Sequence, residues 1–243
     1  MKYTLLFSIT LTSLSAFAQE STVGLRNEFS QISKYTYGKQ SGFEGLQSFS
    51  TKEVKGSQFY FPSWTAGSLI TASNEVMANE YLFLYDKVRQ VLFMRPKDSA
   101  AVLQADKDKI RGFNLLQNGI HNFEVASNYD PNNKTDFYEV LTKNDSAYTL
   151  LKLVKTKSVK FDPSNSANMT KVRDGEMYDE FQDDVTYFVS YKHGLPKNIK
   201  LNENSWRKVL ATDKRRVEDF INANNDSEKN EDLLVRLITS LNQ

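Results

Sequence analysis

The stretch from residue 64 to residue 116 constrains the fold more than any other part of the chain. It contains four apolar, aromatic-rich runs of strand length, W-T-A-G-S-L-I-T, Y-L-F-L-Y-D, V-L-F-M-R-P and I-R-G-F-N-L-L. Asn, Asp, Gly and Pro separate the runs, as they do at turns between strands. The pattern predicts an antiparallel meander in which these runs are successive strands.

Two of these runs are apolar at consecutive positions rather than at alternate ones. Residues 82–85 read L-F-L-Y and residues 91–94 read V-L-F-M. Such runs are typical of strands that are buried on both faces. We therefore expect the rest of the chain to supply a second layer over the meander.

Shorter strand patterns follow the meander. We predict them at residues 121–126, 137–141, 147–154, 157–161 and 185–191. The turn cluster N-Y-D-P-N-N-K-T-D at 128–136 places Asp130, Asn132 and Asp136 at spacings that resemble a calcium loop. It lacks the central Gly and the closing Glu of such a loop, which favours a plain Asx-rich turn.

The period of the apolar pattern changes from two to about 3.6 near residue 202. We predict short helices starting after Ser205, near Asp213 and after Ser227. The last one carries a single apolar stripe, Leu233, Leu234, Leu237, Ile238 and Leu241. The predicted fold class is α+β, a mainly antiparallel β meander or sheet with a C-terminal segment of two or three short helices. Packing of these helices on the sheet is favoured over docking on another protein.

The first eighteen residues read as a signal peptide. Lys2 precedes an apolar run at 5–14, and Ala16-Phe17-Ala18 resembles a cleavage site ahead of Gln19. The chain contains no cysteine, so neither a lipoprotein anchor at the cleavage site nor a disulfide is expected. We predict an exported protein, periplasmic or at the cell surface, that is not a lipoprotein.

The predicted organisation has four parts. They are a signal peptide at 1–18, a partly ordered arm at 19–55, an antiparallel β body at 56–191 and a helical segment at 192–243 that packs on the body. No later stretch has the length and apolarity of a transmembrane helix.

Charge disfavours two classes of partner. Without Lys2, the 31 basic residues become 30, against 30 acidic residues. The two signs are also interspersed, and nucleic-acid or anionic-membrane binding needs a face of one sign.

Aromatic residues supply the candidate ligand site. Phe59, Tyr60, Phe61 and Trp64 surround Pro62. Their simplest interpretation is a turn whose rings plug one end of the sheet. The alternative is a platform for a small molecule or glycan, formed by Phe59, Tyr60, Trp64, Tyr81, Tyr85 and Asp86.

Motifs of common enzymes are absent. The chain has no G-x-S-x-G, no Gly-rich phosphate loop and no H-E-x-x-H. Its two histidines, His121 and His193, are far apart, and we predict no metal, no cofactor and no catalytic residues. A hydrolase built on Asp86 or His121 is the least favoured reading.

The order of several motifs carries a resemblance. K-G-S at residue 55, W-x-x-G at 64, Y-D at 85, I-R-G-F-N-L at 110 and F-Y-E-V-L at 137 are followed by T-Y-F-V and S-W-R-K-V-L-A-T-D-K-R-R-V-E-D-F-I. In this order the chain resembles an uncharacterised family of exported proteins from Bacteroidota, from about residue 55 to the C-terminus. The resemblance implies export and a β-rich body, and it implies no activity.

These observations favour a non-catalytic envelope protein that binds another protein or an envelope component. The alternative is a small-molecule or glycan-binding module that uses the aromatic residues near Trp64.

Overall fold

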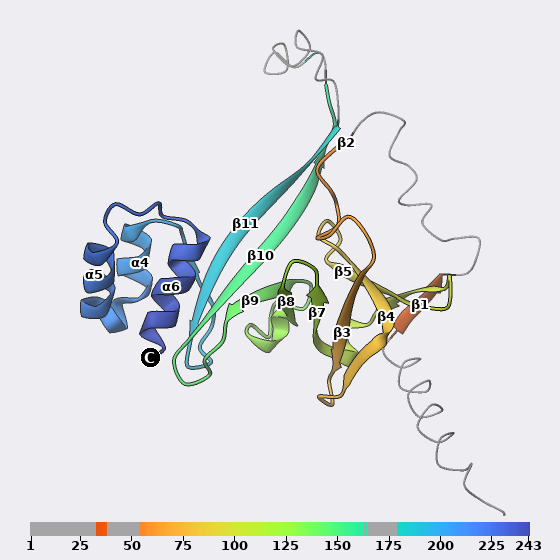
Figure 1. Cartoon of the computed structure of the whole chain (residues 1–243), viewed down its shortest axis with the longest axis horizontal. Helices are drawn as coiled ribbons and strands as arrows, with labels where there is room; N and C mark the ends of the chain where they lie inside the picture. Colours follow the sequence, from red (N-terminus) through yellow and green to blue (C-terminus); the bar gives the residue numbers. More distant parts are fainter. Residues whose placement is uncertain (1–32, 38–53, 163, 165–178) are drawn as a thin grey trace, which may run out of the picture.

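The computed structural model describes residues 33–37, 54–162, 164 and 179–243. The predicted signal peptide and most of the predicted arm at 19–55 lie outside these residues. One large and mostly antiparallel sheet runs through the described chain, and short helices follow it at the C-terminal end (Figure 1). The predicted fold class is confirmed.

The first half of the sheet is a meander that returns to its own first strand. Its strands are β3 (Thr65–Thr71), β4 (Val76–Asp86), β5 (Val91–Pro96) and β6 (Val102–Ala105), with β1 (Ser33–Tyr37) beside β6. After the short 3-10 helix η1 (Lys107–Lys109), β7 (Ile110–Leu116) pairs with β3 instead of continuing from β6. The four predicted runs are all strands, but the predicted order is wrong for the last one.

The second half continues from β7. Its strands are β8 (Ile120–Val125), β9 (Phe137–Thr142), β10 (Tyr148–Val159), β11 (Asp179–Tyr191) and β12 (Lys197–Ile199), with a 3-10 turn η2 (Ala126–Asn128) after β8. The short strand β2 (Val54–Lys55) lies parallel to the start of β11. The predicted separate strand at 157–161 is instead the end of β10, and the predicted strand at 185–191 is only the second half of β11.

The part of the sheet from β4 to β9 curls around its own core. Strands β4 and β9 are separated by three strands in the sheet order, yet the ring of Tyr85 on β4 lies 5.7 Å from that of Phe137 on β9. The rings of Phe113 and Phe123 stack between them at 4.7 Å. Curling therefore lets one face of this part of the sheet bury itself, and no separate layer is needed there.

Burial on both faces is confirmed for the two continuous apolar runs. Phe83 and Met94 belong to the core inside the curl. Leu84 and Phe93 are buried on the opposite face, where they pack with Val102. Each fully buried side chain of this size contributes about 1.5–3 kcal/mol relative to an exposed one.

The helices are α4 (Glu203–Val209), α5 (Lys214–Ala223) and α6 (Glu231–Leu241), with a 3-10 turn η4 (Ala211–Asp213) before α5. The predicted caps Ser205 and Ser227 are wrong. Asn202 and Asn230 cap α4 and α6, because their side chains accept from backbone N–H groups three residues on. The whole predicted stripe of α6 is buried.

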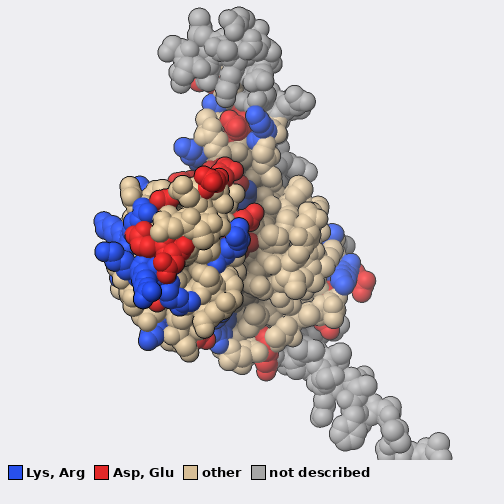
Figure 2. All heavy atoms as spheres, turned by 60° about the vertical axis from the view of Figure 1, so that its left-hand side comes forward, with Lys and Arg blue, Asp and Glu red and all other residues tan. Residues whose placement is uncertain are grey.

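The helices cover only part of the sheet. Their core includes Trp206, Leu234 and Leu237, and it packs on Leu150 of β10 and Val189 of β11. The helices therefore do not supply the expected second layer over the meander at 64–116, where the curl of the sheet encloses its own core. The outer side of the helices carries both signs of charge (Figure 2).

Candidate functional site

The six residues predicted to bind a ligand do not gather on one surface. Phe59 and Trp64 pack against the cluster formed by Leu84, Phe93 and Val102 on the outer face of the curl. Tyr60 and Tyr81 pack against the core on the inner face. The structure thus places these four aromatic residues on opposite sides of the sheet.

The other two predicted residues close the turn between β4 and β5. Asp86 is fully buried, and its carboxylate accepts hydrogen bonds from the backbone N–H of Val88 and Arg89, each at 2.9 Å. Arg89 Nε also donates to it at 2.7 Å. Tyr85 donates its hydroxyl hydrogen to Gln90 Oε1 at 2.8 Å. These hydrogen bonds of both side chains are therefore made within the turn itself.

A row of polar side chains crosses the inner face where the curl meets the helices. Its members, which we call the polar row, are Tyr60, His121, Glu139, Lys152, Tyr187 and Glu231. The strand register explains the row, because Lys152 lies directly opposite Glu139 on one side and Tyr187 on the other. Glu231 enters from the first turn of α6.

Glu139 is the centre of the polar row. Its side chain is 6% exposed, its Oε1 accepts from the Tyr60 hydroxyl at 3.0 Å, and it lies 2.8 Å from His121 Nδ1. Because a carboxylate only accepts, Nδ1 of His121 carries the proton in this contact. The Oε2 atom of Glu139 has no hydrogen bond and lies 3.5 Å from Lys152 Nζ.

Lys152 links the strands to α6. Its Nζ lies 2.9 Å from Glu231 Oε2, which also accepts from the Tyr187 hydroxyl at 2.6 Å. Burial alone would lower the pKa of Lys152, but Glu139 and Glu231 together raise it above the usual range. Burial and the neighbouring carboxylates likewise raise the pKa of Tyr60 and Tyr187. The row therefore acts as a charged tie between sheet and helix.

The hairpin of β10 and β11 extends beyond the body of the protein (Figure 1). The two strands pair without a bulge over twelve residue pairs. We call residues 155–159 of β10 and 180–184 of β11 the projection. Most of its side chains are exposed or half-buried, and Thr156 is the buried exception. Pairing with each other, rather than burial of an apolar face, keeps these residues extended.

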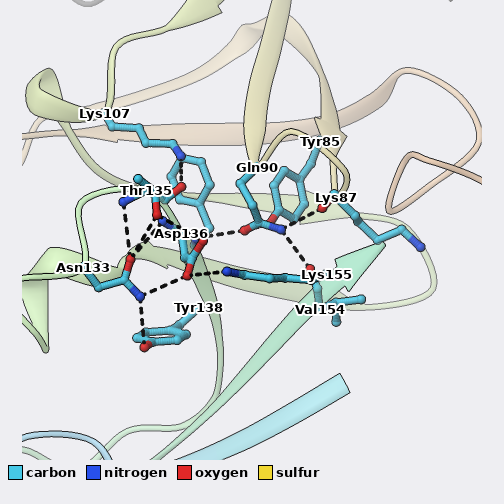
Figure 3. Close-up of polar contacts among 11 residues, drawn as sticks. Tyr85, Lys87, Gln90, Lys107, Asn133, Thr135, Asp136, Tyr138, Val154 and Lys155 are labelled. Carbon is cyan, nitrogen blue, oxygen red and sulfur yellow. Dashed lines mark hydrogen bonds and ion pairs between the residues drawn. The ribbon is translucent and has the colours of Figure 1, made fainter. Parts of the chain in front are cut away.

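The base of the projection is held by a group of polar contacts that we call the junction, and Figure 3 shows those of Gln90 and Lys155. Lys155 lies 3.0 Å from Asp136, and Gln90 Nε2 donates to the carbonyl of Val154 at 2.9 Å. In addition, the 8% exposed side chain of Lys87 lies 2.7 Å from Asp183. The turn after β4, the loop before β9 and both strands of the hairpin therefore meet at one place.

The junction also includes one end of the Asx-rich turn at 128–136. Asp136 accepts from Asn133 Nδ2 at 3.0 Å in addition to its ion pair with Lys155 (Figure 3). Asp130 accepts from the backbone N–H of Asn132, an Asx turn. Among the residues that the structure describes, no group of three or more His, Cys, Asp or Glu side chains is arranged to hold a metal ion.

One open depression in the described part of the chain, of about 540 Å³, is lined by Ala72 and by residues of η1, β7 and η2, and by none of the six predicted residues. In the described part of the chain, no helix combines the length and apolarity needed to cross a membrane.

Sequence reasoning missed the polar row, although a signal for it was present. Glu139 lies two residues after Phe137 in F-Y-E-V-L, and so on the same face of the strand. Lys152 interrupts the apolar run L-L-K-L-V. A charge at an inward position of an apolar strand needs a partner, and each residue is the other's partner. The signal for the projection was weaker, because its strands are polar.

Comparison of the chain with protein-family models, with curated proteins and with solved structures found no match.

Proposed function

We propose that the protein is an exported, non-catalytic component of the cell envelope, and that it binds another envelope protein or component through the projection. The observation that carries this proposal is the hairpin of β10 and β11, which continues in unbroken register past the body while exposing its side chains. The predicted signal peptide, the absence of cysteine and the balanced charge of the sequence support the same reading.

The junction supports the proposal because it fixes the direction of the projection. Three polar contacts, those of Lys87, Gln90 and Lys155, tie the base of the hairpin to two different loops. A two-stranded ribbon alone is marginally stable in water. A binding surface that is held in one orientation loses less conformational entropy when a partner binds.

The proposal is tested by shortening the hairpin. Replacing residues 158–181 with Asn-Gly joins Lys157 to Gln182, which face each other in the register, through a favoured hairpin turn. The variant keeps Lys87 with Asp183 and Lys155 with Asp136. We expect it to fold and to lose at least tenfold in co-sedimentation with washed envelope from the source cells.

A thermal melt of the shortened variant separates loss of binding from loss of folding. The matched control replaces exposed Lys192 by Ser, in the turn at the other end of β11. A folded shortened variant that sediments with envelope as the full chain does would contradict the proposal.

One observation favours a second candidate, a hydrolase that uses His121. The buried Glu139 carboxylate orients the ring through Nδ1, which leaves Nε2 as the basic nitrogen of a 27% exposed side chain. This is the relation of acid to histidine in many hydrolytic sites. Hydrolysis of nitrophenyl esters that is lost in His121→Ala but kept in His193→Ala would support this candidate, and identical rates would remove it.

A further inference from the structure

The projection has an open edge on β10. β10 pairs with β11 along its whole length, but it pairs with β9 only at residues 150–152. Beyond that point, no strand of the described chain pairs with its other edge. The other edge of β11 is partly covered, by β12 near one end and by β2 near the other.

One hydrogen bond fixes which backbone groups face this open edge. The carbonyl of Val154 accepts from Gln90 Nε2, which comes from the turn after β4 and lies outside the hairpin. In a strand, the N–H and C=O of one residue point to the same side, and neighbouring residues alternate. Val154, Thr156 and Ser158 therefore direct their backbone groups outward, while Lys157 and Val159 direct theirs toward β11.

The exposed part of the edge begins after the junction. Thr156 is buried there, and its hydroxyl donates to Asp183, whereas residues 157–160 are exposed. The strand has no Pro and no bulge in this part. An exposed and regular strand edge is a template for pairing with another extended chain.

The charge at this edge indicates what kind of chain fits. Lys157 precedes Ser158, Lys160 lies two residues after it, and the residue opposite Lys157 on β11 is the neutral Gln182. Two copies of this edge, paired antiparallel around Ser158, would make Lys157 of one copy a diagonal neighbour of Lys157 of the other, which disfavours a second copy of the chain. A strand with carboxylates at these positions gains favourable cross-strand pairs.

We propose that the outer edge of β10 around Ser158 accepts an extended acidic segment of an envelope protein as an added strand. This inference rests on the proposed function, and it names the chemistry of the partner. The backbone of Ser158 supplies main-chain hydrogen bonds, and the two lysines select the acidic sequence.

Two substitutions at one position test the inference. Ser158→Pro removes an outward N–H and leaves the pairing of β10 with β11 intact, because that N–H takes no part in it. Ser158→Ala is the matched control, since it removes the hydroxyl and keeps the N–H. The probe is a ten-residue peptide of alternating Glu and Thr, and its control replaces each Glu by Lys.

We expect the acidic peptide to slow amide exchange at residues 158 and 160, whose N–H groups face outward, in the wild type and in Ser158→Ala. We expect its binding to weaken at least tenfold in Ser158→Pro and in the charge reversal Lys157→Glu. No protection at millimolar acidic peptide, or equal binding of both peptides, overturns the inference. So does equal binding by Ser158→Pro, or a concentration-dependent dimer that Ser158→Pro abolishes.

The envelope co-sedimentation assay separates this inference from the proposed function. If the shortened hairpin loses envelope binding and Ser158→Pro keeps it, the faces of the projection bind the partner and the strand-addition inference fails alone. If the shortened hairpin keeps envelope binding, the proposed function fails. Loss of binding in both variants, with Ser158→Ala unaffected, supports both.

Discussion

Replacing Lys152 by Met tests whether the polar row ties the helices to the sheet. Met keeps most of the aliphatic stem of Lys152 and removes its charge. The change leaves the carboxylates of Glu139 and Glu231 without the ammonium group that lies 3.5 Å and 2.9 Å from them. The two carboxylates of the polar row then remain, and the lysine ammonium group between them is gone.

The expected loss in the free energy of unfolding of Lys152→Met follows from the burial of the two carboxylates. Removing one partner of a buried ion pair costs about 3–5 kcal/mol. Glu139 is almost fully buried, but the side chain of Glu231 is 33% exposed and regains contact with water. We therefore expect a loss near the lower end, about 3 kcal/mol, which corresponds to a fall of about 6–12 °C in melting temperature for a chain of this size.

The assay is urea unfolding followed by circular dichroism at several pH values. The pKa of Lys152 is raised above its ordinary value of 10.5, so its stabilisation is fully present below that pH and is lost as pH rises through the folded-state pKa. The difference between wild type and variant should be constant from about pH 6 to pH 9 and should shrink above about pH 10.5.

An exposed lysine on the same strand is the control. Lys157→Met should change the free energy of unfolding by less than about 0.5 kcal/mol. A loss below about 1 kcal/mol for Lys152→Met would refute the reasoning, because it would mean that the two carboxylates do not need the cation.

Three further predictions concern the sheet. Gly112→Ala should lower the free energy of unfolding in urea by about 3 kcal/mol, because the new Cβ would lie 2.1 Å from the carbonyl oxygen of Phe123. An unchanged urea midpoint would show that the two strands can move apart there. Replacing Lys192-His193 by Asn-Gly should raise stability by about 1 kcal/mol, because both residues have positive φ, 48° and 60°; a destabilised variant would contradict this. Burial raises the pKa of Tyr85, so the stabilisation that its neutral hydroxyl gives to the folded state is intact below about pH 10. Above that pH the free energy of unfolding should fall by about 1.4 kcal/mol per pH unit. A urea midpoint that stays flat from pH 9 to pH 11 would count against that claim.

The sequence predicted the elements whose cause is local. The strand at residues 110–116 and the apolar stripe of α6 are both correct, because alternation and helical periodicity report which face is buried. The double-sided burial at 82–85 and 91–94 was equally visible. These features needed no knowledge of distant partners.

The features that sequence reasoning missed depend on long-range pairing. β7 returns to β3, and an apolar strand does not reveal which edge it will join. Glu139 and Lys152 lie on different strands and Glu231 lies on a helix, so their contacts appear only after the sheet has formed. The first half of β11 was not predicted, because residues 179–184 are mostly polar and pairing with β10 rather than burial makes them a strand.

The candidate ligand site shows the same limit. The aromatic residues around Pro62 are close in sequence, but alternation along the chain directs Phe59 and Tyr60 to opposite faces of the sheet. Asp86 is polar and follows an apolar strand, which is as typical of a turn as of a binding site. Sequence spacing alone does not separate these two roles.

Photo-crosslinking in intact envelope tests most directly whether the projection is the binding surface. A benzophenone amino acid would replace Val159, 37% exposed in the projection, and in a separate variant Leu195, 64% exposed near the far end of the same hairpin. The account predicts a discrete adduct from position 159 and none from position 195. Adducts of equal yield from both positions, or an adduct from position 195 alone, would contradict it.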